Sequence, residues 1–198
     1  ADSHVKVGNS NDLGRSRGLF GYIDFRKTIG DNKKITKATF TAYQDYTGAS
    51  SPTIGLYMVT SYYHNEQVTW ENQPTYSSVM ASKAVSATGR HTWDATKLAQ
   101  AMYAEDRSKF MMRNTNENVK INKRFRSESY SNNSSDWPVL EVNYVDAPSA
   151  PASVTVETTG WTKDQIKVSW GTINQTTGAT LTEVQYSTTS ATSGFAKI

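Results

Sequence analysis

The sequence contains no cysteine and no long hydrophobic run. Without a thiol, disulfide bonds, thiolate metal sites and cysteine nucleophiles are excluded. No apolar segment approaches the ~20 residues that a helix needs to cross a bilayer. Ala1 begins a polar stretch, so we expect any export signal to lie upstream or to have been removed. Packing and hydrogen bonds, rather than covalent cross-links, must therefore stabilise the fold.

Motifs of the common enzyme classes are also missing. The histidines are His4, His64 and His91, and none belongs to an HExxH zinc motif. No GxSxG nucleophile elbow occurs. Glu66, Glu71 and Asp94 offer carboxylates that could pair for glycoside hydrolysis. However, Glu71 falls in a predicted turn and Asp94 at a predicted helix start, so we predict no catalytic activity.

The composition is that of a folded, strand-rich protein. Hydrophobic residues make up 36% of the chain and charged residues 20%, and there are 11 tyrosines. Abundant tyrosine, threonine and turn-forming residues favour β-structure. The net charge of +3 permits an acidic polymer as partner but does not demand one. The basic residues are scattered and no RNA-binding motif occurs, so nucleic acid is not expected.

Alternating apolar and polar residues predict many short strands. In one such run, Ala38, Phe40 and Ala42 share a face. Similar alternation occurs in residues 22–27, 54–58, 110–113, 119–121 and 139–145. Many short strands separated by turn clusters predict an all-β fold, a jelly-roll β-sandwich.

Two segments interrupt this pattern. Residues 62–74 contain a short β-prone run at 68–70 that ends in a turn closed by Asn72, Gln73 and Pro74. We expect Asn72 and Gln73 to tie this turn with side-chain hydrogen bonds. Asp94 and Thr96 then begin one short helix, which carries Leu98, Met102 and Tyr103 on one face.

Two prolines divide the chain. Pro148 and Pro151 are separated by small residues and predict a stiff, extended connector at residues 146–151. We therefore predict a first domain at residues 1–145 and a second at residues 152–198.

A family resemblance extends over nearly all of residues 1–145. The ordered pieces that carry it are YIDF, KITKATFTAY, LYMVT, VTWENQP, WDATKLAQAM, KFMMRN, RFRSESYS and WPVLEVNY. This series resembles the DNRLRE-type modules of secreted bacterial proteins, which are related to carbohydrate-binding modules with a jelly-roll fold. The resemblance implies a non-catalytic, surface or glycan-binding role.

The chain departs from this family at its start. It reaches the segment GNSNDLGRSRG after only about seven residues, so we expect the leading strand to be absent or cut short. The neighbouring strand would then keep an open edge unless another chain fills it.

Residues 152–198 resemble the first half of a fibronectin type III domain. The segment DQIKVSWGT, with Trp170, resembles its second strand. A complete domain of that kind needs roughly 100 residues, and about half follow the connector. We therefore expect a partial module that belongs to a longer protein or is completed by a neighbour.

The predicted sugar-binding residues lie on strand faces opposite the core. Phe125 should point inward, so Arg124 and Arg126 point outward with Glu128. Arg113, Tyr43 and Tyr57 are predicted to be outward as well. Arginine grips carboxylates, including those of uronic acids, with a bidentate fork. The alternative, an ordinary solvated basic face, remains open.

Other polar and aromatic residues have plainer interpretations. Five aromatic residues are predicted to fill core or corner positions: Trp70, Trp93, Phe110, Phe125 and Tyr144. No cofactor is expected. A structural calcium ion is a weaker hypothesis, with Asp2 and Asp12, beside Asn9 and Asn11, as candidate ligands.

Together these features predict a non-catalytic module of a larger bacterial protein that is secreted or attached to the cell surface. Its partner would be a polysaccharide or cell-wall glycan. The alternative is a structural spacer or filament subunit that self-associates through open strand edges.

Overall fold

The computed structural model describes residues 3–12, 14–46, 50–64, 67–130 and 134–147, followed by four short segments at 154–157, 167–170, 185–187 and 195–197. The chain divides into two compact units, Ala1–Tyr144 and Val145–Ile198. The predicted connector at 146–151 follows this division, and most of it lies outside the described residues. The proposed domain boundaries stay a prediction.

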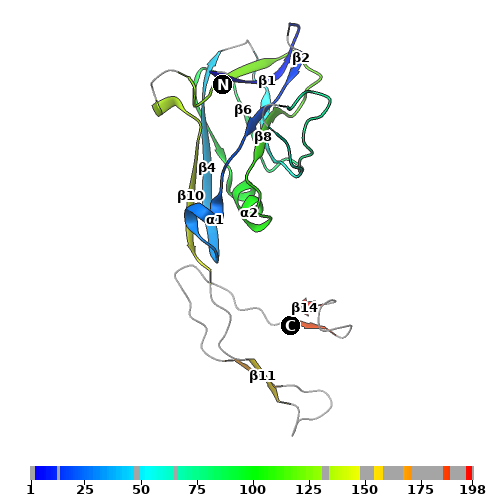
Figure 1. Ribbon diagram of the computed structural model, residues 1–198, viewed down its shortest axis with the longest axis vertical. Coiled ribbons are helices and arrows are strands. Elements are labelled where there is room, and N and C mark those ends of the chain that lie inside the picture. Colours follow the sequence, from blue (N-terminus) through cyan, green and yellow to red (C-terminus); the bar gives the residue numbers. More distant parts are fainter. Residues whose placement is uncertain are drawn as a thin grey trace. The chain divides into compact units, whose positions relative to one another are not determined.

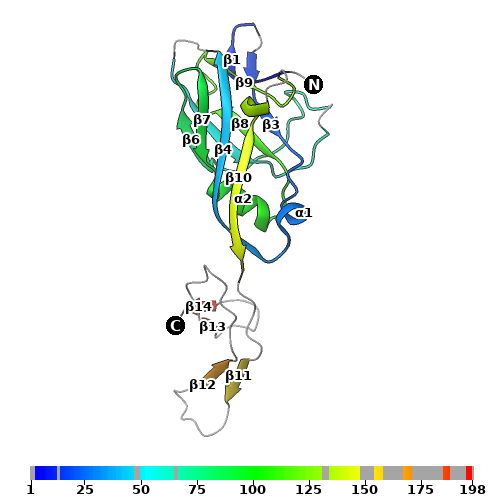
Figure 2. The ribbon, with the colours of Figure 1, turned by 90° about the vertical axis from the view of Figure 1, so that its left-hand side faces the viewer.

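The first unit is a sandwich of two β-sheets (Figures 1 and 2). The first sheet has the strand order β10-β4-β9-β1-β2, with β7 also paired to β4, and the second has the order β3-β8-β5-β6. The strands are β1 (His4–Ser10), β2 (Gly14–Ser16), β3 (Gly18–Phe20), β4 (Lys33–Tyr46), β5 (Thr53–Met58), β6 (Ala81–Ala84), β7 (Gly89–Asp94), β8 (Phe110–Asn114), β9 (Asn122–Arg126) and β10 (Val139–Asp146). This architecture confirms the predicted all-β sandwich.

Aromatic rings from both sheets form the centre of the core. Phe40 lies 5.7 Å from Trp93 and 5.1 Å from Phe110, measured between ring centroids. Phe125 contacts Trp93 from β9, and Phe20 stacks on Phe110 from β3. These rings remove a large apolar area from water, which is the main driving force for packing the sheets.

A hydrogen bond also joins the two sheets through this core. The indole Nε1 of Trp93, on β7, donates to the carbonyl oxygen of Ile54, on β5, at 3.0 Å. The bond satisfies the only polar atom of a fully buried indole.

Two α-helices lie at the same end of the sandwich (Figures 1 and 2). Helix α2 (Thr96–Ala104) buries Leu98, Ala99 and Met102, as its periodicity predicted. Helix α1 (Phe25–Ile29) replaces the strand expected at residues 22–27, so that prediction was wrong. The side chain of Asp24 caps α1 by accepting from the backbone N–H of Lys27. A local cap thus overrides the alternating pattern.

Three further expectations about strands were wrong. Residues 68–70 form no strand, and the strand expected at 119–121 begins instead at Asn122. The leading strand is present as β1, which pairs with β9 and with β2. The expected open edge on β9 is therefore occupied by β1. The segment GNSNDLGRSRG is the end of β1 and its hairpin with β2.

The second unit contains two antiparallel strand pairs in its described part. Strand β11 (Val154–Glu157) pairs with β12 (Lys167–Trp170), and β13 (Gln185–Ser187) pairs with β14 (Phe195–Lys197). Its assignment to the fibronectin type III fold stays a prediction. None of the helices in the described residues has the length and apolar character of a membrane span.

Gly8 offers a test of the β1–β9 register. Its φ is 128°, and a Cβ atom there would lie 2.1 Å from the carbonyl oxygen of Ile121. That oxygen accepts a hydrogen bond from the backbone N–H of Asn9, so moving it away from a Cβ atom would break this bond. We expect Gly8→Ala to lower the free energy of unfolding by about 3 kcal/mol in urea denaturation.

Gly14 is the matched control. Its φ is also positive, at 65°, but a Cβ atom there would meet nothing within 4 Å. Gly14→Ala should therefore cost only about 1 kcal/mol. Equal losses for the two variants would contradict the close approach of Gly8 to Ile121.

Candidate functional site

The predicted sugar-binding residues do not share one face. Tyr43 on β4 and the two arginines of β9, Arg124 and Arg126, lie on the outer face of the first sheet. Tyr57 on β5 and Arg113 on β8 belong to the second sheet. The expectation of a single face was therefore wrong, because alternation orients a side chain but does not assign its strand to a sheet.

A row of polar side chains crosses four strands of the first sheet. Arg90 on β7 is directly opposite Tyr43, and His4 on β1 is directly opposite Arg126. Tyr43 and Arg126 meet between β4 and β9, where the guanidinium lies 4.0 Å from the ring centroid. Directly paired residues in antiparallel strands project to the same side. The row therefore spans the sheet from β7 to β1.

Arg126 is the centre of this row. Its guanidinium contacts two aromatic rings, because the centroid of Tyr130 lies 4.2 Å away in addition to that of Tyr43 at 4.0 Å. It also donates to the carboxylate of Asp136. The same carboxylate accepts from Arg90 at 3.4 Å. Arg126 is therefore held in one orientation by stacking and by charge.

Asp45 organises the adjoining part of the face. Its carboxylate accepts from Nε of Arg124 at 2.8 Å and lies 2.7 Å from Nε2 of His4. Burial alone would raise the pKa of Asp45, but the hydrogen bonds from Arg124 and His4 outweigh it and hold the pKa below its ordinary value. Asp45 therefore stays ionised and positions Arg124.

We call these residues of the first sheet's outer face the arginine patch. Its members are His4, Lys6, Tyr43, Asp45, Tyr46, Arg90, Arg124, Arg126, Tyr130 and Asp136. Four cations, without His4, face two carboxylates, so the patch is positively charged. The side chains of Arg90 and Arg124 are 50% and 40% exposed, and Tyr46 is 52% exposed. These three groups can reach a ligand, whereas Arg126 is mostly covered.

Sequence reasoning identified only three of the ten members of this patch, Tyr43, Arg124 and Arg126. The alternation on β4 places Asp45 on the same face as Tyr43 and could have identified it. No local signal indicates His4 or Arg90, because their positions depend on the register of β1 and β7. Glu128, which was predicted to join the site, is exposed beyond the end of β9 and lines a different hollow.

The other two predicted residues, Tyr57 and Arg113, belong to a buried ion-pair cluster around Glu117. Glu117 accepts from Nε and an Nη of Arg17 at 2.7 and 2.6 Å, and Arg113 approaches it at 3.0 Å. The side chains of Arg17, Arg113 and Glu117 are only 12%, 16% and 8% exposed. Burial lowers the pKa of Arg17, but Glu117 outweighs this, so the pKa lies above its ordinary value.

A long loop, residues 60–80, covers the outer face of the second sheet. Tyr63, Val68 and Tyr76 from this loop pack on Tyr57 and Met111. Burial raises the pKa of Tyr57, and it raises the pKa of Tyr63 to about 12. Tyr57 therefore lies outward from the core, as predicted, but beneath the loop and away from solvent.

The turn at residues 69–73 is tied as predicted. Asn72 accepts from the backbone and hydroxyl of Thr69 and donates to the carbonyl of Gln67, and Gln73 donates to the carbonyl of Trp70. Trp93, Phe110 and Phe125 are buried as expected. Trp70 and Tyr144, however, are exposed, so the core prediction was wrong for these two residues.

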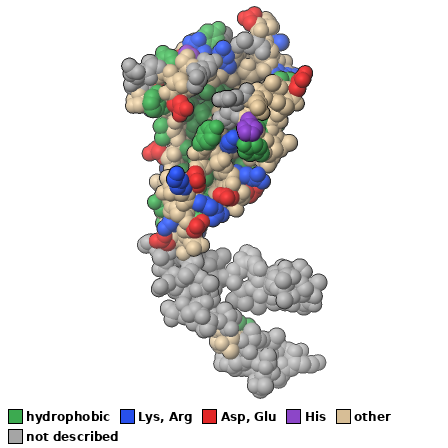
Figure 3. All heavy atoms as spheres, in the orientation of Figure 1, with side chains coloured by type: hydrophobic (Ala, Val, Ile, Leu, Met, Phe, Trp, Pro, Cys, Tyr) green, Lys and Arg blue, Asp and Glu red, His purple; other side chains and the backbone are tan. Residues whose placement is uncertain are grey.

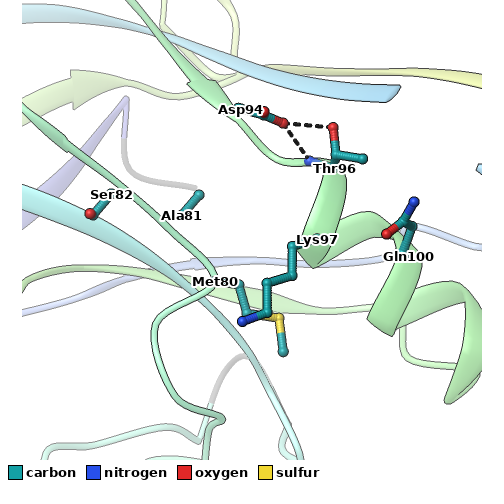
Figure 4. Close-up of a pocket in the computed structure, with 7 residues that line it drawn as sticks. All are labelled: Met80, Ala81, Ser82, Asp94, Thr96, Lys97 and Gln100. Atoms are coloured by element: carbon teal, nitrogen blue, oxygen red, sulfur yellow. Dashed lines mark hydrogen bonds between the residues drawn. The ribbon is translucent and has the colours of Figure 1, made fainter. Parts of the chain in front are cut away.

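Two other hollows lack the character of a sugar site. In Figure 4, Asp94 accepts from the backbone and hydroxyl of Thr96 at 3.0 and 2.6 Å, beside an open cavity of about 430 Å³. The N-cap of α2 is Ala95, without a side-chain cap bond, so the prediction of Asp94 as the cap was wrong: it lies one residue earlier and ties down Thr96, the first residue of the helix. A second hollow, of about 560 Å³, is lined mainly by apolar residues, among them Val5, Phe20, Phe40 and Leu140. Figure 3 shows hydrophobic side chains gathered around a recess on the face that it draws.

Candidate metal and catalytic groups are dispersed where they are described. Within the described residues, no three His, Asp or Glu side chains converge to hold a metal ion. Asp12 is exposed, while Asp2 lies outside the described residues. Asn9, the other suggested calcium ligand, donates its amide to the carbonyl oxygen of Glu117. Glu66 also lies outside the described residues, and Glu71 is exposed in its turn.

Removing the charge of Glu117 should destabilise the fold. Glu117→Gln keeps the shape but leaves Arg17 and Arg113 close together without a counter-charge. We expect the free energy of unfolding to fall by about 3 kcal/mol in urea denaturation. The control is Asp31→Asn, which breaks an exposed pair with Arg26 and should change the free energy of unfolding far less. Similar losses in both variants would contradict the role assigned to Glu117.

Asp45 should make stability depend on pH. Because its pKa is lowered in the folded state, its contribution is present above the unfolded pKa of about 3.9 and is lost as the pH falls through the folded value. The stability difference between the parent and Asp45→Asn should be largest near about pH 6 and shrink below about pH 4. A difference independent of pH, measured by denaturant titration, would contradict this.

Two comparisons with known proteins bear on the family of this chain. A search of curated proteins finds no match. A protein-family model, that of carbohydrate-binding module family 96, matches residues 1–144, which correspond to the first compact unit. The match covers well over half of the chain. The chain therefore belongs to carbohydrate-binding module family 96.

Proposed function

We propose that the first unit binds an anionic polysaccharide through the arginine patch and has no catalytic activity of its own. The observation that carries this proposal is the row from Arg90 through Tyr43 and Arg126 to His4. It combines planar cations with aromatic rings on one side of a sheet. An open row across several strands suits an extended chain better than a small enclosed ligand.

The accessible members of the patch would make the contacts. Arg124 and Arg90 can direct N–H groups toward sugar carboxylates, and bidentate pairs of this kind are among the stronger hydrogen bonds. The exposed ring of Tyr46 offers an apolar surface with a polar edge, which suits the C–H face of a sugar. Asp45 and Asp136 already form ion pairs with the arginines. A ligand carboxylate would therefore bind an arginine that keeps its bond to one of these two aspartates.

Acidic polysaccharides are favoured over neutral ones by the charge of the patch. Its four cations and two carboxylates leave a positive surplus on this face of the sheet. Uronic acid polymers carry carboxylates at regular intervals and could engage several of these groups together. Binding at an exposed surface should be moderate and sensitive to salt.

The wider context is part of the same proposal. The module holds a longer, multi-modular bacterial protein at a polysaccharide or cell-wall glycan outside the cell. Support comes from the family, from the resemblance to DNRLRE-type modules and from the second compact unit that follows. The catalytic step, if the parent protein has one, would belong to another part of it.

Self-assembly as a spacer or filament subunit is the second reading, and the structure supplies less support for it. The edge that was expected to be open on β9 is filled by β1. Strands β2 and β3, at one end of each sheet, have only three residues each, and β6 has four, whereas β10, at the other end of the first sheet, has eight. Short edges are a common protection against strand addition.

Replacing the exposed arginines tests the proposed function. Arg90→Ala combined with Arg124→Ala should weaken binding to a uronate polymer by at least about tenfold, since each charged hydrogen bond contributes about 1.5 kcal/mol or more. Raising the salt concentration should weaken binding by the parent protein. Affinity electrophoresis and calorimetry on the full chain would measure both effects.

A charge-matched control separates the patch from general basicity. Arg26 and Arg107 are 42% and 40% exposed and belong to the helical end of the sandwich. Arg26→Ala with Arg107→Ala removes the same charge and should leave affinity unchanged. Equal losses in the two double variants, or no binding to any acidic polysaccharide by the parent, would overturn the proposal.

A further inference from the structure

A small cavity beside Trp70 is the strongest unassigned feature of the first unit. It measures about 200 Å³ and is lined by Arg15, Arg17, Thr69, Trp70 and Gln73 over an apolar floor. The floor includes Leu19 and Met111, which belong to the outer face of the second sheet. The cavity therefore lies on the second sheet's side of the sandwich, whereas the arginine patch lies on the first.

The backbone of Trp70 is tied into its turn, and its indole contacts Arg17 while staying open to solvent. Gln73 donates to the carbonyl of Trp70 at 2.8 Å and accepts from Arg17. The guanidinium of Arg17 lies 4.7 Å from the indole centroid. Despite these contacts Trp70 remains 46% exposed. An aromatic side chain that is both fixed and exposed can bind a ring without first losing conformational entropy.

The charge beneath this cavity is positive. Arg17 and Arg113 share the single carboxylate of Glu117, so the buried cluster carries one surplus positive charge. Arg15 lies at the surface, 6.0 Å from the indole centroid, and donates to the neutral amide oxygen of Asn118 at 3.1 Å. A buried surplus charge is costly unless an anion approaches it. The cavity is therefore suited to a ligand that carries a negative charge.

We propose that this cavity is a second carbohydrate site, which binds one anionic sugar residue. The sugar ring packs against the exposed part of Trp70, and its carboxylate or sulfate group lies at Arg15 and Arg17. The cavity is smaller than the roughly 300 Å³ at which drug-sized pockets begin, so it admits one ring rather than a chain. It would recognise a chain end or a side branch, whereas the arginine patch follows an extended chain.

Two sites on opposite faces have a functional consequence. A module that holds an extended chain on one sheet and a terminal residue on the other can link two polysaccharide chains. Where the extended chain and the terminal residue belong to one polysaccharide network, simultaneous binding at the two sites raises the apparent affinity above that of either site alone. The inference goes beyond the proposed function and does not require the arginine patch to bind.

The test uses the indole N–H resonance of Trp70 in the full chain, assigned by comparison with Trp70→Phe. The probes are glucuronic acid and glucose 6-sulfate, which distinguish a carboxylate from a sulfate as the anion. Glucose, acetate and inorganic sulfate are the controls. We expect the resonance to shift saturably with at least one acidic sugar and to stay in place with every control.

Variants complete the experiment. Arg15→Ala, followed through the Trp70 resonance, should weaken acidic sugar binding by about tenfold or more, and so should Trp70→Ala, which lacks that resonance and is followed by calorimetry. The Arg90/Arg124 double variant should bind the sugar normally. Trp137→Ala, which removes an exposed tryptophan elsewhere, is the matched control for Trp70. Arg17 is left intact because it stabilises the fold through Glu117.

The outcomes are distinct from those of the polysaccharide experiment. A shift that is equal with glucose, a shift with the simple ions alone, no shift at all, or unchanged binding in Arg15→Ala would each overturn the second site. Loss of acidic sugar binding in the Arg90/Arg124 variant would also overturn it, by assigning the ligand to the arginine patch. None of these results depends on whether that patch binds a polymer.

Discussion

The contact between the two sheets through Trp93 is the constraint on which the rest of the structure depends. Its ring packs against Phe40 and Phe125, and its N–H bonds to the carbonyl of Ile54 across the sandwich. This fixes the face of each strand that points inward. Because side chains alternate along a strand, every residue between the core positions must then point outward. The arginine patch is the direct result on the first sheet.

The two outer faces are completed in different ways. On the second sheet, residues from the loop at 60–80 cover Tyr57 and Met111. The ion pairs of Glu117 with Arg17 and Arg113 also join segments on this side of the sandwich. On the first sheet no described loop covers Tyr43 and Arg126 to this extent, and charged pairs lie beside solvent. The same residue types therefore have different roles: Arg113 contributes to a buried cluster, whereas Arg124 remains accessible.

Much of the fold could be predicted, and the errors have identifiable causes. The alternation that predicted β4, β5 and β10 and the periodicity that predicted α2 each extend over several residues. One residue that departs from such a pattern therefore does not change the prediction. Helix α1 was missed because the side chain of Asp24 caps it within an alternating segment. Trp70 was expected in the core because large aromatic residues are usually buried, but it lies in a loop whose turn holds it at the surface.

The sequence by itself determined the all-β class, the orientation of most strand residues and the absence of covalent cross-links. It also indicated a carbohydrate-binding family through an ordered set of short motifs. Only the tertiary structure decided which strands are neighbours, and hence that Arg90, Tyr43, Arg126 and His4 form one row while Arg113 lies elsewhere. The physical reason is that alternation acts within a strand, whereas strand order and register arise from contacts between distant segments.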